Sequence, residues 1–452
     1  MPDHKPRKHL CLDSMIQMIY DSFDSIPDHR PNRRKDKISL LDTLMSAFAM
    51  MHLKYPSLLE FDRERETEEL KFNLKHLYRV QGRIPCDTYM RSTLDPVDPG
   101  AMREPFKLLF NEVQRGGGLK GFRFSCAGLK DHYLLAIDGT GLYYSGKCRC
   151  QECCIKNEGK ANEAYYHQML AACIVHPDRE TVLPLAPEPI VHQDGTTKND
   201  CEKNALKRLL SDIKRDHPQL KLVIVLDGLY ADGPTVRLIR SYGWHYIIVA
   251  KDGNHTSMIE AMDALDQKGD VKRFEMTDGN GAKHWCRYAN GVPLNKTEPV
   301  EIVNVLDYVE TDKKGKRHTW GWITDIPLTE ETVLPTAEGG RCRWHIENET
   351  FNTLKNQGYE LEHNYGHGEQ HLATNLAYLT FLTFLAFLVD QIQQLCCPVF
   401  QKALKLRARG TRTYLWKLIL RYFLYWLIES WEEMFQAIIH GTAARKIQFD
   451  TS

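Results

Sequence analysis

Apolar residues recur at helical spacing at both ends of the chain and give way to strand-like runs between them. In the N-terminal part, Leu40, Leu44 and Phe48 fall on one face of a predicted helix. Helix-like spacing is present over residues 1–127 and returns over residues 371–452. We therefore predict a helical region at each end of the chain.

Short apolar runs bounded by polar residues dominate the middle of the chain, and this pattern is typical of buried strands. Two of the runs end in Asp-Gly, with Asp138 after residues 133–137 and Asp227 after residues 222–226. The other predicted elements are strands at 165–175, 181–190 and 246–250 and helices at 201–216 and 234–242. Their order, β-β-β-α-β-α-β, predicts a mixed α/β core.

A segment rich in Thr, Val, Gly and charged residues, residues 256–335, interrupts this core. Within it, residues 300–305 and 318–324 have the pattern of half-buried strands around a turn. The segment is therefore predicted to be a β-rich insertion. The core itself is predicted at residues 128–255 and 336–370.

Composition excludes few functions. The chain has 452 residues, of which 42% are hydrophobic, and it contains 59 Lys plus Arg against 59 Asp plus Glu. With a net charge of zero, any binding to nucleic acid must come from local basic patches. The N-terminus lacks the apolar run of a secretory signal. The most apolar predicted helix, residues 376–389, is shorter than the ~20 residues that span a bilayer, so we expect a soluble, cytoplasmic protein without a membrane partner.

Two basic segments are candidates for contact with DNA. The first is a loop at residues 31–37 that contains Arg33 and Arg34 and follows Arg30. The second, residues 402–421, contains Lys405, Arg407, Arg409, Arg412 and Lys417. A solvated charged surface has the same composition, so both interpretations stay open.

A predicted helix late in the core carries a carboxylate among apolar residues. Trp344 and Phe351 are seven residues apart and are predicted to share one face, with Glu347 at its margin. Glu349 lies two residues after Glu347, about 200° further round at roughly 100° per residue, and should face elsewhere. Arg343 precedes Glu347 by four residues, so the two could also form a simple surface ion pair.

Three acidic residues can meet in the predicted fold. If the strands before Asp138 and Asp227 are neighbours, both carboxylates lie at one edge of the sheet, where Glu347 can join them. Hard oxygen ligands suit Mg²⁺ or Mn²⁺. Two such ions about 4 Å apart promote in-line displacement at phosphorus by activating the attacking oxygen and stabilising the leaving one.

A cysteine cluster is the second chemical signal. Cys148, Cys150 and Cys153, with His167 on a predicted strand, could hold Zn²⁺ in a tetrahedral site. The spacing differs from paired Cys-x-x-Cys knuckles, and Cys153 and the adjacent Cys154 cannot easily bind one ion together. Reduced thiols in a loop are therefore the alternative.

The sequence resembles the DDE transposases of bacterial insertion sequences, in particular those with a β-strand insertion in a ribonuclease-H-like core. The resemblance rests on Asp138-Gly139-Thr140, on Leu226-Asp227-Gly228-Leu229-Tyr230 and on Arg343-Trp344-His345-Ile346-Glu347. The helix signature of this family is Tyr, two residues, Arg, three residues, Glu, six residues, Lys. Arg343 and Glu347 fit it, whereas Gly340 stands at the Tyr position and Lys355 comes one residue late, about 80° round a regular helix.

The resemblance implies that Asp138, Asp227 and Glu347 form the catalytic, metal-binding triad, and that Arg343 and Lys355 contact DNA. It also implies cleavage and strand transfer at transposon ends, with the inverted repeats and target DNA as double-stranded partners and a homodimer on the DNA. The N-terminal helical region resembles the region that binds the transposon ends in proteins of this family. Two alternatives remain, namely a ribonuclease-H-like nuclease without strand transfer and a catalytically silent, transposase-derived DNA-binding protein.

Overall fold

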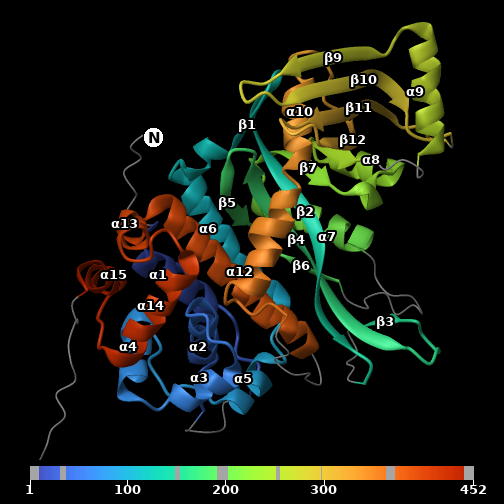
Figure 1. The fold of residues 1–452 in the computed structure, drawn as a ribbon. Helices are drawn as coiled ribbons and strands as arrows, with labels where there is room; N and C mark the ends of the chain where they lie inside the picture. The colour runs from blue at the N-terminus through green and yellow to red at the C-terminus, as the bar shows by residue number, and fades with distance from the viewer. Residues whose placement is uncertain are drawn as a thin grey trace, which may run out of the picture.

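The structure is a computed structural model that describes residues 10–30, 37–147, 153–190, 202–250, 255–296, 298–362 and 372–441. A central sheet separates a large helical region from a β-rich extension (Figure 1). All the described strands belong to one sheet.

The core of the sheet has the strand order β5-β4-β2-β7-β8. β2 is parallel to β7, and β7 to β8, whereas β4 is antiparallel to both β2 and β5. These strands are β2 (Leu129–Ser145), β4 (Ala164–His176), β5 (Arg179–Pro184), β7 (Lys221–Leu226) and β8 (His245–Val249). Three antiparallel strands followed by two parallel ones, each reached through a helix, form a ribonuclease-H-like core. The predicted fold class is thereby confirmed.

The short strands of the core are β1 (Arg123–Cys126), β3 (Cys154–Lys156) and β6 (Glu188–Ile190). The prediction of one strand over residues 181–190 is wrong, because β5 ends at Pro184 and β6 pairs with a different part of β4. Pro184 and Pro187 have no N–H to donate, which interrupts the ladder between the two strands.

Helices cover both faces of the core sheet. The pairing register places Ala136, Cys173, Val225 and Ile247 in one row across it. α10 and the π-helical turn η5 cover this face, as the contacts of Gly339 with Ile247 and of Thr350 with Cys173 show. α7 and α8 pack on the opposite face. The bounds are α7 (Glu202–Asp216), α8 (Gly233–Ser241), α10 (Val333–Arg341), η5 (Ile346–Phe351) and α11 (Asn352–Asn356).

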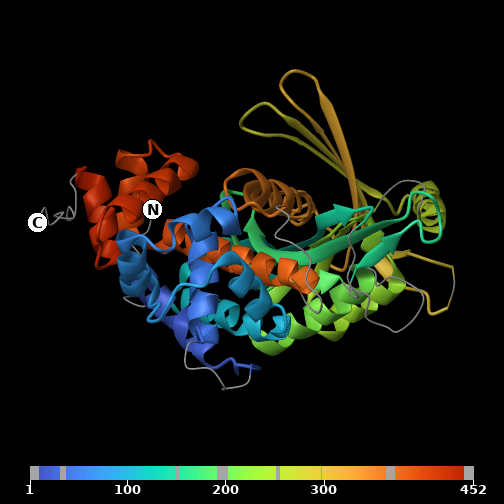
Figure 2. The same cartoon turned by 90° about the horizontal axis from the view of Figure 1, so that it is seen from below.

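The insertion between β8 and α10 extends the sheet. Its last strand, β12, pairs antiparallel with β8, and β11, β10 and β9 follow in order. Figure 2 shows its hairpins projecting from the core. Its elements are α9 (Thr256–Lys268), β9 (Lys272–Thr277), β10 (Lys283–Pro293), β11 (Ile302–Thr311) and β12 (Arg317–Thr324).

The helices from the two ends of the chain pack together beside the core (Figure 1), with α12 against α2 and α14 against α4. The first set is α1 (Leu12–Asp24), α2 (Leu40–His52), α3 (Leu58–Glu64), α4 (Glu68–Tyr78), α5 (Asp87–Leu94), η2 (Pro99–Met102), α6 (Arg103–Arg115) and η3 (Gly118–Phe122). The second set is α12 (Leu372–Cys396), α13 (Pro398–Leu406), α14 (Arg412–Tyr425) and α15 (Trp431–His440).

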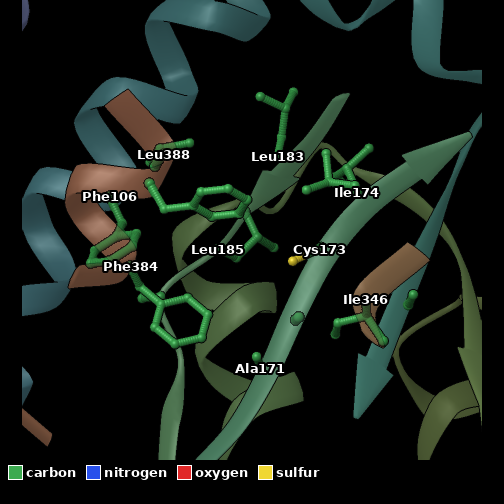
Figure 3. Packing of buried hydrophobic residues seen from close by; sticks show 14 of the residues in the cluster. Phe106, Ala171, Cys173, Ile174, Leu183, Leu185, Ile346, Phe384 and Leu388 are labelled. Atoms are coloured by element: carbon green, nitrogen blue, oxygen red, sulfur yellow. The ribbon is translucent and has the colours of Figure 1, made fainter. Parts of the chain in front are cut away.

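α12 is longer than the sequence pattern predicted. Within the described residues, one helical segment, Leu379–Cys396 of α12, has the length and the apolar composition needed to cross a membrane. However, 83% of this segment is buried inside the protein. Phe384 and Leu388 of α12 pack in the hydrophobic core that also contains Leu183 of β5 (Figure 3). This burial accounts for the apolar composition of the helix.

A buried ionic cluster connects the two sets of helices. Asp390 of α12 lies 2.7 Å from Lys54 Nζ and 3.2 Å from His52 Nε2. The Tyr359 hydroxyl, beyond α11, also donates to Asp390. The cluster thus links α2, α12 and the segment that follows the Glu347 turn.

Candidate active site

Asp138 and Asp227 lie at equivalent positions on neighbouring parallel strands. Ala136 of β2 pairs with Val225 of β7, and each aspartate comes two residues later. Asp138 was predicted at the tip of its strand, but β2 continues to Ser145 because β4 still pairs with it. Asp138 therefore lies where β2 extends beyond β7.

Local hydrogen bonds hold both aspartates. The Gly139 N–H donates to Asp138 Oδ1 at 2.9 Å. Asp227 caps a single 3₁₀ turn, η4 (Gly228–Tyr230), by accepting the Leu229 N–H at 2.9 Å. In each Asp-Gly pair the carboxylate is thus fixed by backbone that immediately follows it.

Glu347 reaches the same place from a π-helical turn. Ile346 and Phe351 of this turn are buried, whereas the Glu347 side chain is 50% exposed. Figure 3 shows Ile346 beside β4, near Cys173. The prediction that Trp344 shares the buried face of Phe351 is wrong, because the chain turns between α10 and η5, and Trp344 is left 42% exposed.

Arg343 joins two of the three carboxylates. Its Nη1 lies 2.7 Å from Asp138 Oδ2 and 2.7 Å from Glu347 Oε1. The predicted ion pair with Glu347 therefore exists, and it also bridges to the sheet. Glu349 faces elsewhere, where the charges that reach it are those of Arg412 and Glu180.

The site carries excess negative charge. Burial raises the pKa of Asp138 to about 6, from an ordinary value of 3.8. The Arg343 guanidinium lowers this pKa, but the charges of Glu347 and Asp227 raise it further. A single guanidinium among three carboxylates leaves a net charge that favours a cation.

The donor set suits Mg²⁺ or Mn²⁺, because all three groups are carboxylates and each is partly accessible to solvent. As they stand, no three His, Cys, Asp or Glu side chains within the described residues are arranged so that they could hold a metal ion. The Arg343 guanidinium lies between Asp138 and Glu347 and occupies part of the space. Metal binding would therefore require Arg343 to move aside.

Comparison with known proteins decides the family. The sequence model described as transposase DDE domain matches residues 129–385, which is more than half of the chain. The chain belongs to this transposase family. The matched segment contains Asp138, Asp227 and Glu347. No protein of curated function matches the chain.

Among solved structures, the fold is similar to one titled "Cryo-EM structure of piggyBac transposase synaptic complex with hairpin DNA". The similarity has a TM-score of 0.40 and 10% sequence identity, and it covers 96% of this chain and 80% of that one.

The π-helical turn changes the interpretation of Lys355 in the family's helix signature. A π turn bonds i to i+5 and so accommodates one residue more than an α turn. The estimate of about 80° between Lys355 and Glu347 assumed a regular α-helix, which the turn replaces over residues 346–351. The extra residue is thus absorbed before Lys355, whose Nζ lies 2.6 Å from Glu362 Oε1.

The predicted zinc ligands are only partly described. Cys153 Sγ lies 3.2 Å from His167 Nε2, while Cys154 Sγ lies 3.7 Å from the Ile190 carbonyl. The two adjacent thiols therefore have different neighbours. Cys148 and Cys150 lie outside the described residues, and zinc at this site stays a prediction.

The N-terminal residues predicted to contact DNA are only partly described. Arg33 and Arg34 lie outside the described residues. Arg30, which was grouped with them, donates hydrogen bonds from its guanidinium to Asp28, Tyr89, Thr93 and the Ile38 carbonyl, so it stabilises the fold.

In the C-terminal basic segment, Arg407 Nε donates to the Ile439 carbonyl at 2.8 Å, so this side chain also stabilises the helical region. The segment was treated as one basic surface, but it is divided between α13 and α14.

Sequence reasoning missed Glu202, and it included Tyr230 in the motif after Asp227 without giving it a role. Glu202 lies in the first turn of α7 and accepts a hydrogen bond from the Tyr230 hydroxyl at 3.1 Å. Burial raises the pKa of Tyr230, and the charges of Glu202, Asp227 and Asp138 raise it further. The one available signal was the tyrosine three residues after Asp227.

Proposed function

We propose that this protein is a transposase that cleaves DNA at the ends of an insertion sequence and joins them to target DNA. In this proposal Asp138, Asp227 and Glu347 bind two Mg²⁺ or Mn²⁺ ions. The observation that carries it is the convergence of these carboxylates around Arg343, from two parallel strands and a later helix. Membership of the family supports the same reaction.

When bound, such ions would activate the attacking oxygen and stabilise the leaving oxygen. The chain's own groups have separate tasks. Asp138 and Asp227 hold the site at the sheet edge, and Glu347 contacts the same Arg343 Nη1 as Asp138 does. With cations on the carboxylates, Arg343 would be free to contact a DNA phosphate beside the scissile bond, where a positioned positive charge stabilises developing negative charge. Lys355 is proposed to contact phosphate next to it.

The end DNA is proposed to bind the N-terminal helical region, on Arg33, Arg34 and a basic cleft. This cleft has a volume of about 910 Å³ and includes Ile38, which follows Arg33 by five residues in the sequence. Its basic lining residues are Arg65, Lys71, Lys75 and Arg83, against Glu66. Such a local excess of cations supplies the phosphate contacts that the neutral overall charge does not. A homodimer on DNA is part of the same proposal.

The test uses a supercoiled plasmid that carries the sequences flanking the gene. Wild-type protein should cut it in Mg²⁺ or Mn²⁺ and not in EDTA. Asp138→Asn, Asp227→Asn and Glu347→Gln should each abolish cutting but retain binding to the flanking DNA. Glu349→Gln, on the same turn but facing elsewhere, is the matched control and should cut normally. Wild-type rates in any one of the first three variants would remove that residue from the triad.

Two other functions are distinguished by the same assay. A nuclease of the same fold would release cut ends that are never joined to target DNA. A silent DNA-binding derivative would bind without cutting, although the presence of all three carboxylates argues against it.

A further inference from the structure

We propose that Glu202 is a fourth carboxylate ligand of the active site and binds one of the two divalent cations. This inference rests on the proposed function. Glu202 lies on the face of the sheet covered by α7, whereas Glu347 comes from η5 on the other face. Asp138 and Asp227 lie between them. The four carboxylates thus surround the sheet edge from both sides.

The close approach of Glu202 to β2 requires the glycine after Asp138. A Cβ on residue 139 would lie 2.8 Å from Glu202 Oε1 and 3.0 Å from its carboxyl carbon. Real Cβ atoms essentially never approach a neighbour within 3.0 Å. Gly139, the residue after Asp138, therefore leaves a space on the strand that the Glu202 carboxylate fills.

The second oxygen of Glu202 has a fixed neighbour. Tyr230, which is fully buried, donates its hydroxyl hydrogen bond to Oε2. Tyr230 follows Asp227 by three residues in the same turn, so the hydrogen bond fixes Glu202 relative to Asp227. Oε1, on the Gly139 side, is the oxygen left to bind a cation.

Charge balance indicates that a cation belongs there. In the part of the chain that the structure describes, neither Glu202 nor Asp227 has an ion-pair partner, and the charge of Asp227 acts on Glu202. Arg343 forms its two ion pairs with Asp138 and Glu347, and its charge reaches Asp227 only from beyond ion-pair distance. Two carboxylates held near each other without an ion-pair partner are costly unless a cation binds.

The alternative is that Glu202 only anchors Tyr230. Glu202→Gln separates the two roles, because the amide oxygen still accepts the Tyr230 hydroxyl while the negative charge is lost. Tyr230→Phe is the complementary variant, since it removes the hydrogen bond and keeps the carboxylate. Glu349→Gln controls for loss of one carboxylate near the site.

The experiment counts Mn²⁺ ions bound to the full-length protein without DNA, by titration with MnCl₂ and electron paramagnetic resonance of the free ion. Wild type should bind two ions, and Glu202→Gln should weaken one of them by about tenfold or more. Tyr230→Phe should weaken binding less, and Glu349→Gln should leave it unchanged. Melting curves in EDTA should place Glu202→Gln close to wild type.

Equal Mn²⁺ binding by wild type and Glu202→Gln would overturn the inference, as would an equal loss in Glu202→Gln and Tyr230→Phe. Asp138→Asn separates this failure from failure of the proposed function. If Asp138→Asn loses Mn²⁺ binding and DNA cleavage while Glu202→Gln keeps both, the triad is supported and only the proposed role of Glu202 is refuted.

Discussion

Neutralising Asp138 should stabilise the metal-free protein at alkaline pH. The pKa of Asp138 in the folded chain is about 6, against 3.8 for an ordinary aspartate. Because the folded pKa is the higher one, the stabilisation from the bound proton is present below pH 4 and is lost as pH rises through 6. Two pKa units correspond to about 3 kcal/mol, so ionised Asp138 destabilises the fold at pH 8 by up to that amount.

Asp138→Asn removes this penalty, and its amide oxygen can still accept the Gly139 N–H. The attraction of Arg343 is already included in this folded pKa, so the lost ion pair needs no separate correction. We therefore expect the variant to be more stable than wild type by up to about 3 kcal/mol at pH 8 and by about 1 kcal/mol at pH 4.5.

The assay is urea unfolding in EDTA at both pH values. Asp131→Asn is the control on the same strand, because Asp131 forms an exposed ion pair with Arg123, and its loss should cost under about 1 kcal/mol. A variant less stable than wild type at pH 8 would mean that the ion pair with Arg343 outweighs burial, which would refute the reasoning. Saturating Mn²⁺ should stabilise wild type and have little effect on Asp138→Asn.

Three other changes follow from single contacts. Asp390→Asn should lower the free energy of unfolding by about 3–5 kcal/mol, because it leaves Lys54 buried without its counter-charge. Urea unfolding measures this loss. A loss under about 1 kcal/mol would mean that Lys54 is solvated or has another ion-pair partner. Arg343→Ala should slow single-turnover cleavage at saturating DNA by about a hundredfold or more with little change in melting temperature. A rate within a few fold of wild type, with a lowered melting temperature, would leave Arg343 as a structural partner only. The double variant Lys75→Glu, Arg83→Glu should bind end DNA more weakly and with a weaker dependence on salt concentration. Each lost phosphate contact removes about one ion from the slope of log K against log salt concentration. An unchanged slope would place the cleft outside the DNA interface.

The parts of the site that depend on local sequence could be predicted. Asp138 and Asp227 each follow an apolar run and precede glycine, so the strand pattern alone indicated the sheet edge. The pairing register of β2 with β7 then places Asp138 and Asp227 at equivalent positions on the two neighbouring parallel strands. Glu347 could be predicted from its position four residues after Arg343.

The parts that depend on distant packing could not. Glu202 lies in a helix whose pattern shows only a surface carboxylate, and its role follows from a contact with Gly139 more than 60 residues away (202 minus 139). The π-helical turn that alters the spacing to Lys355 has no signature in the apolar periodicity, which assumes a constant turn. Arg30 looked like part of a basic loop because its partners, such as Tyr89, are remote in sequence.

The most direct test of the central claim is a joining assay. A labelled DNA end from the sequence flanking the gene, already cut and carrying a 3′-OH, is incubated with target plasmid, protein and Mn²⁺. We predict that wild type links the labelled strand to the plasmid, and that joining is lost with a 3′-deoxy end, in EDTA and with Asp227→Asn. Cutting of uncut ends without any joining of the 3′-OH end would contradict the assignment as a transposase and leave a nuclease. Joining that persists in Asp227→Asn would contradict the role of the carboxylates.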